Sequence, residues 1–144
     1  MKVYVDTNVL VARCVAQHPH HDHAVTLFRE IEAKRWIPVI STHGLAEVYA
    51  VLTAAPFKPR ISALEAWQIL DRNILGRIEA EPLGRKDYVH ILKESAGHGW
   101  TGGRIYDAIH IHAARKTECM KIFTFNVQHF RQIAPDLLDR IMAP

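Results

Sequence analysis

The sequence is poor in cysteine and lacks any long apolar run. Its two cysteines, Cys14 and Cys119, have neither C-x-x-C spacing nor the Cys/His spacing of a zinc site, so we interpret both as buried reduced thiols. No apolar run approaches the roughly 20 residues that a membrane-spanning helix needs. No basic segment followed by an apolar stretch opens the chain. We therefore expect a cytoplasmic protein with no contact to a membrane.

Disorder and low complexity are excluded as well. About half of the residues (49%) are apolar, and proline and glycine number only 7 each, which is typical of a chain with a proper core. A length of 144 residues predicts a single domain spanning residues 1–144. The formal charge of +3 weakly favours a polyanionic partner such as nucleic acid.

Strand-like and helix-like patterns alternate along the chain. Short apolar or alternating runs predict strands at 2–6, 36–42, 77–83 and 121–126. Amphipathic periodicity and breaker residues predict helices at 8–16, 20–35, 43–55, 60–70, around 88–92 and at 102–116. Strands separated by helices imply a mainly parallel sheet covered on both faces, so we predict a three-layer α/β/α fold.

Two serines mark helix starts. Ser41, or its neighbour Thr42, is the candidate cap of the helix predicted at 43–55. Ser62 and Glu65 have the spacing of a capping box at the start of the next helix.

Polar side chains stand where the predicted strands end. Asp6 follows the first strand, Glu47 lies about one helical turn beyond the second, and Thr124 and Asn126 close the strand at 121–126. Ligands in open α/β sheets bind beyond the carboxyl ends of the strands, so these residues are expected at one edge. Each also has an ordinary structural interpretation: a helix cap for Asp6, a solvated helix face for Glu47 and a turn for Asn126.

Asp107 lies in the first turns of the helix predicted at 102–116, between residues otherwise destined for burial. The helix dipole favours a carboxylate there, which is its structural interpretation. Together with Asp6 and Glu47, however, it gives three acids that need protons or a metal if they converge. Oxygen ligands suit a hard ion such as Mg²⁺ or Mn²⁺, which activates water against a phosphodiester.

The sequence resembles the PIN-domain family, and specifically the VapC-type toxins of toxin–antitoxin modules. The residues that carry this resemblance are "VDTNVLV" at 5–11, "STHGLAEVYAVLT" at 41–53, "GGRIYDAIHIHAA" at 102–114 and "IFTFNVQHF" at 122–130. The resemblance implies an endoribonuclease, a hydrolase that uses Mg²⁺ or Mn²⁺ to cut a defined cellular RNA. It further implies a small VapB-like antitoxin as the cognate partner and a homodimer.

The resemblance also implies roles for individual residues. Asp6 and Asp107 match the principal metal ligands, and Glu47 completes the shell directly or through water. Thr7 and Asn8 match positions that brace the first aspartate, and Thr124 matches a hydroxyl that supports the site.

Asn126 departs from the family pattern, because members often carry a fourth acid near this position. Its amide oxygen makes Asn126 a further candidate metal ligand, but it adds no charge, so we predict one tightly bound ion. A PIN-like module that binds RNA or a partner without cutting is the alternative function. A haloacid-dehalogenase phosphatase is disfavoured, since it needs a second aspartate where Asn8 stands, and no acidic pair before Asp6 supports a receiver domain.

Basic and imidazole side chains complete the candidates. Arg104, at the start of the 102–116 helix, is a candidate phosphate ligand or else a solvated helix-terminal arginine. The tract "HPHHDH" at 18–23 is interpreted as a solvated helix start rather than a zinc site, since neighbours on a helix point in different directions. His110 shares the face of Asp107, and a packed or hydrogen-bonded histidine is the favoured interpretation there.

Overall fold

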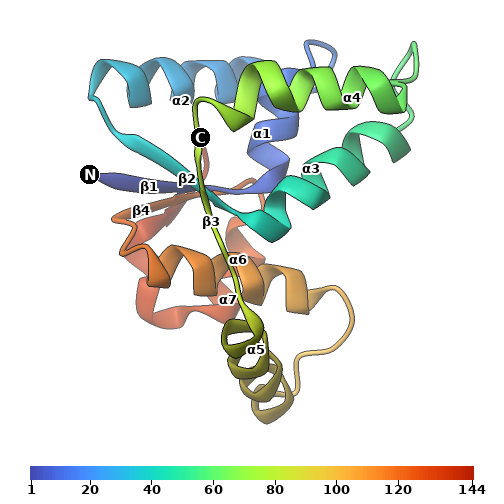
Figure 1. Ribbon diagram of the computed structural model, residues 1–144. Coiled ribbons are helices and arrows are strands. Elements are labelled where there is room, and N and C mark those ends of the chain that lie inside the picture. Colours follow the sequence, from blue (N-terminus) through green and yellow to red (C-terminus); the bar gives the residue numbers. More distant parts are fainter.

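The computed structural model describes residues 1–144, which form a five-stranded sheet between two layers of helices (Figure 1). The strand order is β3-β2-β1-β4-β5, and every neighbouring pair is parallel. The predicted α/β/α architecture is confirmed, with a sheet that is parallel throughout. The strands are β1 (Lys2–Val5), β2 (Ile37–Ser41), β3 (Glu79–Glu81), β4 (Lys121–Phe123) and β5 (Ile141–Met142).

Helices cover both faces of the sheet. In Figure 1, α1 to α4 lie above it and α5 to α7 lie below it. The upper layer comprises α1 (Thr7–Cys14), α2 (His21–Ala33), α3 (Thr42–Ala54) and α4 (Ala63–Leu70), which continues as the π-helical turn η1 (Asp71–Leu75). The lower layer comprises α5 (Arg85–His98), α6 (Arg104–Lys116) and α7 (Val127–Ile133), with the 3₁₀ segment η2 (Pro135–Arg140) before β5.

The central strand β1 supplies both halves of the core because successive strand residues point to opposite faces. Val3 and Val5 are fully buried in the cluster under the upper helices. Tyr4, also fully buried, belongs to the cluster under the lower helices. The polar end of the Tyr4 side chain is thereby placed inside the lower layer.

Helix starts follow the capping signals. Ser41 is the cap of α3, and its hydroxyl accepts the backbone N–H of Gly44 at 3.0 Å. Ser62 and Glu65 form the predicted capping box: the Glu65 N–H donates to Ser62 Oγ at 3.2 Å, and the Ser62 N–H donates to Glu65 Oε2 at 2.7 Å. None of the helices combines the length and the hydropathy required to cross a bilayer.

The structure departs from the sequence expectations mainly near the carboxyl end. The strand expected at 121–126 ends at Phe123, so Thr124 and Asn126 lie in the turn that follows it. The short strand β5 and the helix α7 were not predicted, because elements this short give weak periodicity. Both contribute side chains to the lower cluster, and β5 forms the edge strand beside β4.

Candidate active site

The sheet has a topological switch point between β1 and β4. The chain adds β2 and β3 on one side of β1 and then returns to add β4 and β5 on the other. Crevices at such a point, outside the carboxyl ends of the strands, are where open α/β sheets bind ligands. Asp6 directly follows β1 here, and its backbone N–H donates to the carbonyl of Phe123 at the end of β4 at 2.9 Å.

Asp6 is held by a hydroxyl rather than used as a helix cap. It occupies the residue before α1, yet its side chain makes no capping hydrogen bond to that helix. Thr124 instead donates its hydroxyl to Asp6 Oδ2 at 2.6 Å, and the aspartate is only 4% exposed. Burial raises the pKa of Asp6 above its ordinary value. The charge of His110 and the Thr124 hydrogen bond act in the opposite direction but do not cancel the effect of burial.

Glu47 reaches the same place from α3. Its Oε2 accepts the hydroxyl hydrogen of Thr7 at 3.1 Å and lies 3.1 Å from His110 Nε2. Its Oε1 lies 2.7 Å from His43 Nε2, although neither of these two atoms makes a hydrogen bond of good geometry. Burial acts to raise the pKa of Glu47, but the hydrogen bond and charge of His110 hold it below its ordinary value.

Asp107 completes the group from α6 and has no close partner. The nearest basic nitrogen is His129 Nδ1, at 4.0 Å from Asp107 Oδ2. Burial raises the pKa of Asp107 above its ordinary value, and the charge of Asp6 raises it further. A half-buried carboxylate without a hydrogen-bond donor from the protein is free to bind a cation or a water molecule from solution.

The three acids line one cavity of about 240 Å³, which we call the acid cavity. No lysine or arginine lines it, so its negative charge is met only by imidazole. Its walls come from α1, α3, α6 and the two adjoining turns: Asp6, Thr7, Asn8, Val11, His18, Glu47, Val51, Tyr106, Asp107, His110 and Asn126. The sequence had separated Asp6 from Asp107 by a hundred residues, and the switch point brings them together.

Thr7 and Asn8 occupy different parts of the cavity wall. The Thr7 hydroxyl bonds Glu47, while a hydrogen bond from the Thr7 backbone N–H helps to lower the pKa of Asp6. Asn8 donates to the Thr124 hydroxyl at 3.4 Å and accepts the Phe125 N–H at 3.3 Å, so it secures the turn that carries the Asp6 partner. The exposed Asn126 also lines the cavity.

Two other candidates lie outside it or only at its rim. Arg104 does not line the cavity, and its guanidinium donates to Gln132 Oε1 at 2.7 Å. In the histidine tract, His18 lines the cavity while His21 Nδ1 bonds the carbonyl of Ala12 at 2.8 Å. Helix α2 begins at His21, within the tract.

His110 is packed and hydrogen-bonded, as the sequence favoured, and it also reaches the acids. It is 2% exposed, and its Nε2 lies 3.4 Å from Asp6 Oδ1 as well as 3.1 Å from Glu47 Oε2. Burial lowers the pKa of His110, but Tyr4, Asp6 and Glu47 together raise it well above the ordinary value. The only early signal was its three-residue spacing from Asp107, which puts both on one helix face.

The side chains fit a hard divalent cation in an open site. Glu47 Oε1 is buried without a proper hydrogen bond, and Asp107 has no close donor, so both offer oxygen to a cation. No three His, Cys, Asp or Glu side chains already surround one point as a closed metal site requires. Mg²⁺ suits this arrangement because it keeps several waters and binds through one or two carboxylates plus substrate phosphates.

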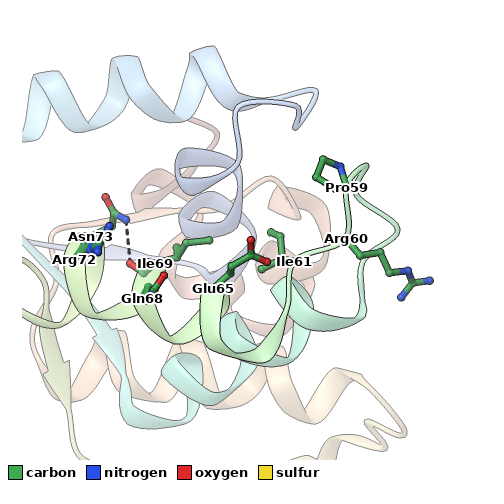
Figure 2. A pocket seen from close by; sticks show the side chains of 8 residues that line it. All are labelled: Pro59, Arg60, Ile61, Glu65, Gln68, Ile69, Arg72 and Asn73. Atoms are coloured by element: carbon green, nitrogen blue, oxygen red, sulfur yellow. Dashed lines mark hydrogen bonds between the residues drawn. The ribbon is translucent and has the colours of Figure 1, made fainter.

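A second hollow, of about 290 Å³, lies along α4 and offers no comparable chemistry (Figure 2). Its single carboxylate belongs to Glu65, which already caps the helix, and Asn73 donates to the carbonyl of Ile69 at 3.0 Å. The side chain of Arg60 points away from the hollow in Figure 2. The residues that line it are Pro59, Arg60, Ile61, Glu65, Gln68, Ile69, Arg72 and Asn73.

Comparison with known proteins agrees with the fold. The family model described as "PIN domain" matches residues 3–135. Ribonuclease VapC27 of Mycobacterium tuberculosis is 30% identical over 105 residues, which are 73% of this chain and 71% of that protein.

Two solved structures are similar in fold. VapC20 of Mycobacterium tuberculosis, titled a sarcin–ricin loop cleaving toxin, gives a TM-score of 0.68 at 17% identity, over 88% of this chain and 92% of that one. VapBC2 from Rickettsia felis, titled as bound to a DNA fragment from their promoter, gives a TM-score of 0.71 at 22% identity. The match covers 100% of this chain and 99% of that one. At these identities the likeness concerns the fold alone.

Proposed function

The chain belongs to the PIN-domain family, and on that premise we propose that it is an endoribonuclease that needs Mg²⁺ or Mn²⁺. It hydrolyses phosphodiester bonds of a defined cellular RNA. The reaction class is supported by the likeness to ribonuclease VapC27, which covers 73% of this chain.

The proposal includes the setting in which such an enzyme acts. The chain is the toxin of a VapBC-type module, inhibited by a small cognate antitoxin, and it works in the cytoplasm as a homodimer. The similarity to VapC27 and to the VapBC2 structure supports the toxin–antitoxin setting. Charge adds a physical argument for the substrate, because a chain of net charge +3 attracts a polyanion.

A single observation carries the proposal: Asp6, Glu47 and Asp107 line one cavity that no lysine or arginine neutralises. A structural cluster of acids would be paired with cations, since an unpaired buried charge destabilises the fold. The imidazole of His110 offsets part of the charge of Asp6 and Glu47, and Asp107 has no close partner. Three acids that share a single imidazole leave negative charge for a metal ion to neutralise.

The residues divide the work by their contacts. Thr124 fixes one oxygen of Asp6, and the other faces the cavity side near His110. Asp107 presents a carboxylate with no competing donor closer than 4.0 Å. When bound, the divalent ion lowers the pKa of water and offsets charge on the phosphate. Asp6 and Asp107 would hold that ion, with Glu47 orienting or accepting a proton from water and Asn126 offering an amide oxygen.

The test measures RNA cleavage and metal binding on the same preparations. Purified protein is incubated with structured RNAs in Mg²⁺, in Mn²⁺ and in excess chelator, beside Asp6→Asn and a matched surface variant, Asp22→Asn. We expect cleavage by the wild type and by Asp22→Asn only with metal, and none by Asp6→Asn. Mn²⁺ should also raise the Tm of the wild type but not of Asp6→Asn, since binding to the native state alone stabilises it.

A module that binds RNA or a partner without cutting is the second candidate function. The exposed amide of Asn126 at the acid cavity, where the family often has an acid, is the observation that favours it. RNA retained on the wild type without cleavage in any metal would support this candidate. Cleavage that persists in chelator or in Asp6→Asn would contradict both functions as stated.

A further inference from the structure

The imidazole of His110 is the only side chain that contacts two of the three acids through one atom. Its Nε2 lies 3.1 Å from Glu47 Oε2 and 3.4 Å from Asp6 Oδ1. Thr7 Oγ1, which donates to the same Glu47 oxygen, lies 3.5 Å from this nitrogen. A single buried group of α6 thus connects Asp6, which follows β1, with Glu47 of α3.

The other ring nitrogen is anchored on β1. The Tyr4 hydroxyl lies 2.8 Å from His110 Nδ1, and the same hydroxyl oxygen accepts the backbone N–H of Ser41 at 3.1 Å. Both Tyr4 and Ser41 are fully buried. The rotation of the imidazole is therefore set by two strands of the sheet and does not depend on the solvent.

Packing restricts the ring from its remaining sides. The ring of Phe130 from α7 stacks on it, with ring centres 6.2 Å apart and planes at 22°. Above it, a Cβ added at Gly44 of α3 would stand 3.3 Å from His110 Cε1 and 2.5 Å from the side chain of Ile40. Gly44 is thus the residue that lets α3 approach closely enough for Glu47 to meet the imidazole.

We propose that His110 is a positioning residue of the active site: held by Tyr4, it fixes Glu47 and Asp6 around one nitrogen in the orientation that metal and substrate require. This inference rests on the nuclease function proposed above. His110 does not act on RNA directly, because its ring is 2% exposed. It acts through the two carboxylates that it aligns, as outer partners of metal ligands commonly do.

The experiment compares His110→Leu, His110→Gln and His112→Gln. Leucine fills the space without any donor, whereas the glutamine amide can again donate to Glu47. His112 lies on the same helix but bonds Asp87 Oδ1 at 2.8 Å, away from the acid cavity, so it is the matched control. Three quantities are measured on each protein: kcat and KM for RNA, the Kd for Mn²⁺ by electron paramagnetic resonance, and the ¹³C resonance of the Glu47 carboxylate without metal.

His110→Leu should lower kcat and weaken Mn²⁺ binding, each by about 10- to 100-fold, with KM for RNA unchanged. It should also move the Glu47 resonance. His110→Gln should recover most of the kcat and Mn²⁺ affinity, and His112→Gln should leave all three quantities at the wild-type values. A role limited to filling the core would instead be met by leucine and would not be rescued by glutamine.

Tyr4→Phe covers the case in which His110→Leu does not fold, as judged by circular dichroism. It removes one hydroxyl from the anchor and keeps the aromatic ring in the core, so we expect a loss of kcat and Mn²⁺ affinity of about 10-fold. If the folded variants keep the wild-type kcat, Kd for Mn²⁺ and Glu47 resonance, the positioning role is wrong.

The same design separates this inference from the proposed function. A wild type that cuts no RNA contradicts the nuclease proposal, yet the Glu47 resonance in metal-free protein still shows whether His110 holds the carboxylate. Conversely, if the wild type cuts RNA and His110→Leu changes neither the Glu47 resonance nor kcat, the nuclease function stands and the positioning role of His110 is wrong.

Discussion

Helix α6 carries two histidines, His110 and His112, which contact carboxylates in two different surroundings. His110 faces the acid cavity, where Asp107 has no basic nitrogen closer than 4.0 Å and Asp6 accepts a hydroxyl and lies 3.4 Å from His110 itself. His112 faces α5, where Asp87 accepts from His112 Nε2 at 2.8 Å and Lys116 Nζ at 3.0 Å.

The difference between the two regions is clearest between Asp87 and Asp107, in the number of donors around each carboxylate. Asp87 also accepts the backbone N–H of Gly84 at 2.8 Å, so three donors surround one acid and lower its pKa far below the ordinary value. In the acid cavity burial raises the pKa of both Asp6 and Asp107, whereas His110 holds the pKa of Glu47 below its ordinary value. A carboxylate with its donors in place ties two helices together, whereas carboxylates left short of donors are available to a cation from solution.

The largest effect that separates the two regions is expected from Asp107→Asn. Removing this charge should lower kcat for RNA cleavage by more than about 100-fold, the upper end of what changes to outer partners cost. That factor corresponds to about 2.7 kcal/mol of barrier. The free energy of unfolding in chelator should not fall, because the Asp107 carboxylate makes no short contact that asparagine would lose.

Urea unfolding and single-turnover cleavage measure the two quantities on one preparation. An Asp107→Asn protein that loses stability together with activity would place Asp107 among the structural carboxylates, and the contrast with Asp87 would disappear.

The acid cavity was largely predictable because its determinants are local. Asp6 follows an apolar strand and Asp107 opens an amphipathic helix, and a parallel sheet with one switch point brings such strand ends together. Glu47 was predictable only in combination with them, since on its own a glutamate beside a buried helix stripe is usually solvated.

The partners of these acids could not be predicted in the same way. His110 was interpreted as a packed histidine, and it is packed, but its two ring nitrogens meet residues that lie 106 and 63 positions away along the chain. Such contacts depend on the depth of a side chain between layers, which periodicity does not report. The contacts of Asp87 were not predicted for the same reason. The way in which α5 packs on α6 depends on the loop between them, and the sequence does not give the geometry of that loop.

A smaller effect is expected from Asp87→Asn, and it should fall on stability rather than on activity. The substitution weakens the contacts to His112 and Lys116, so the free energy of unfolding should fall by about 1 to 2 kcal/mol, since Lys116 is partly exposed and screened. The kcat for RNA should stay at the wild-type value, because Asp87 does not line the acid cavity. Urea unfolding with matched cleavage assays checks both expectations; a loss of kcat in fully folded Asp87→Asn would mean that the two regions are coupled through α6.

The smallest effect, and the one that defines the Asp87 contacts most closely, is its pH dependence. Hydrogen bonds from His112, then Gly84 and Lys116, lower the pKa of Asp87 in the folded protein. A carboxyl group with a lowered folded pKa contributes stability above its unfolded pKa, about 3.9, and loses it as the pH falls toward the folded value. The stability difference between wild type and Asp87→Asn should therefore be constant from pH 7 to 5. Below about pH 4 it should shrink by at most about 1.4 kcal/mol per pH unit. Urea unfolding of both proteins at pH 7, 5, 4 and 3 gives the difference directly. A difference that is the same at pH 3 as at pH 7 would mean that Asp87 helps the fold by its shape and backbone bond, and that its charge contributes nothing to holding α5 on α6.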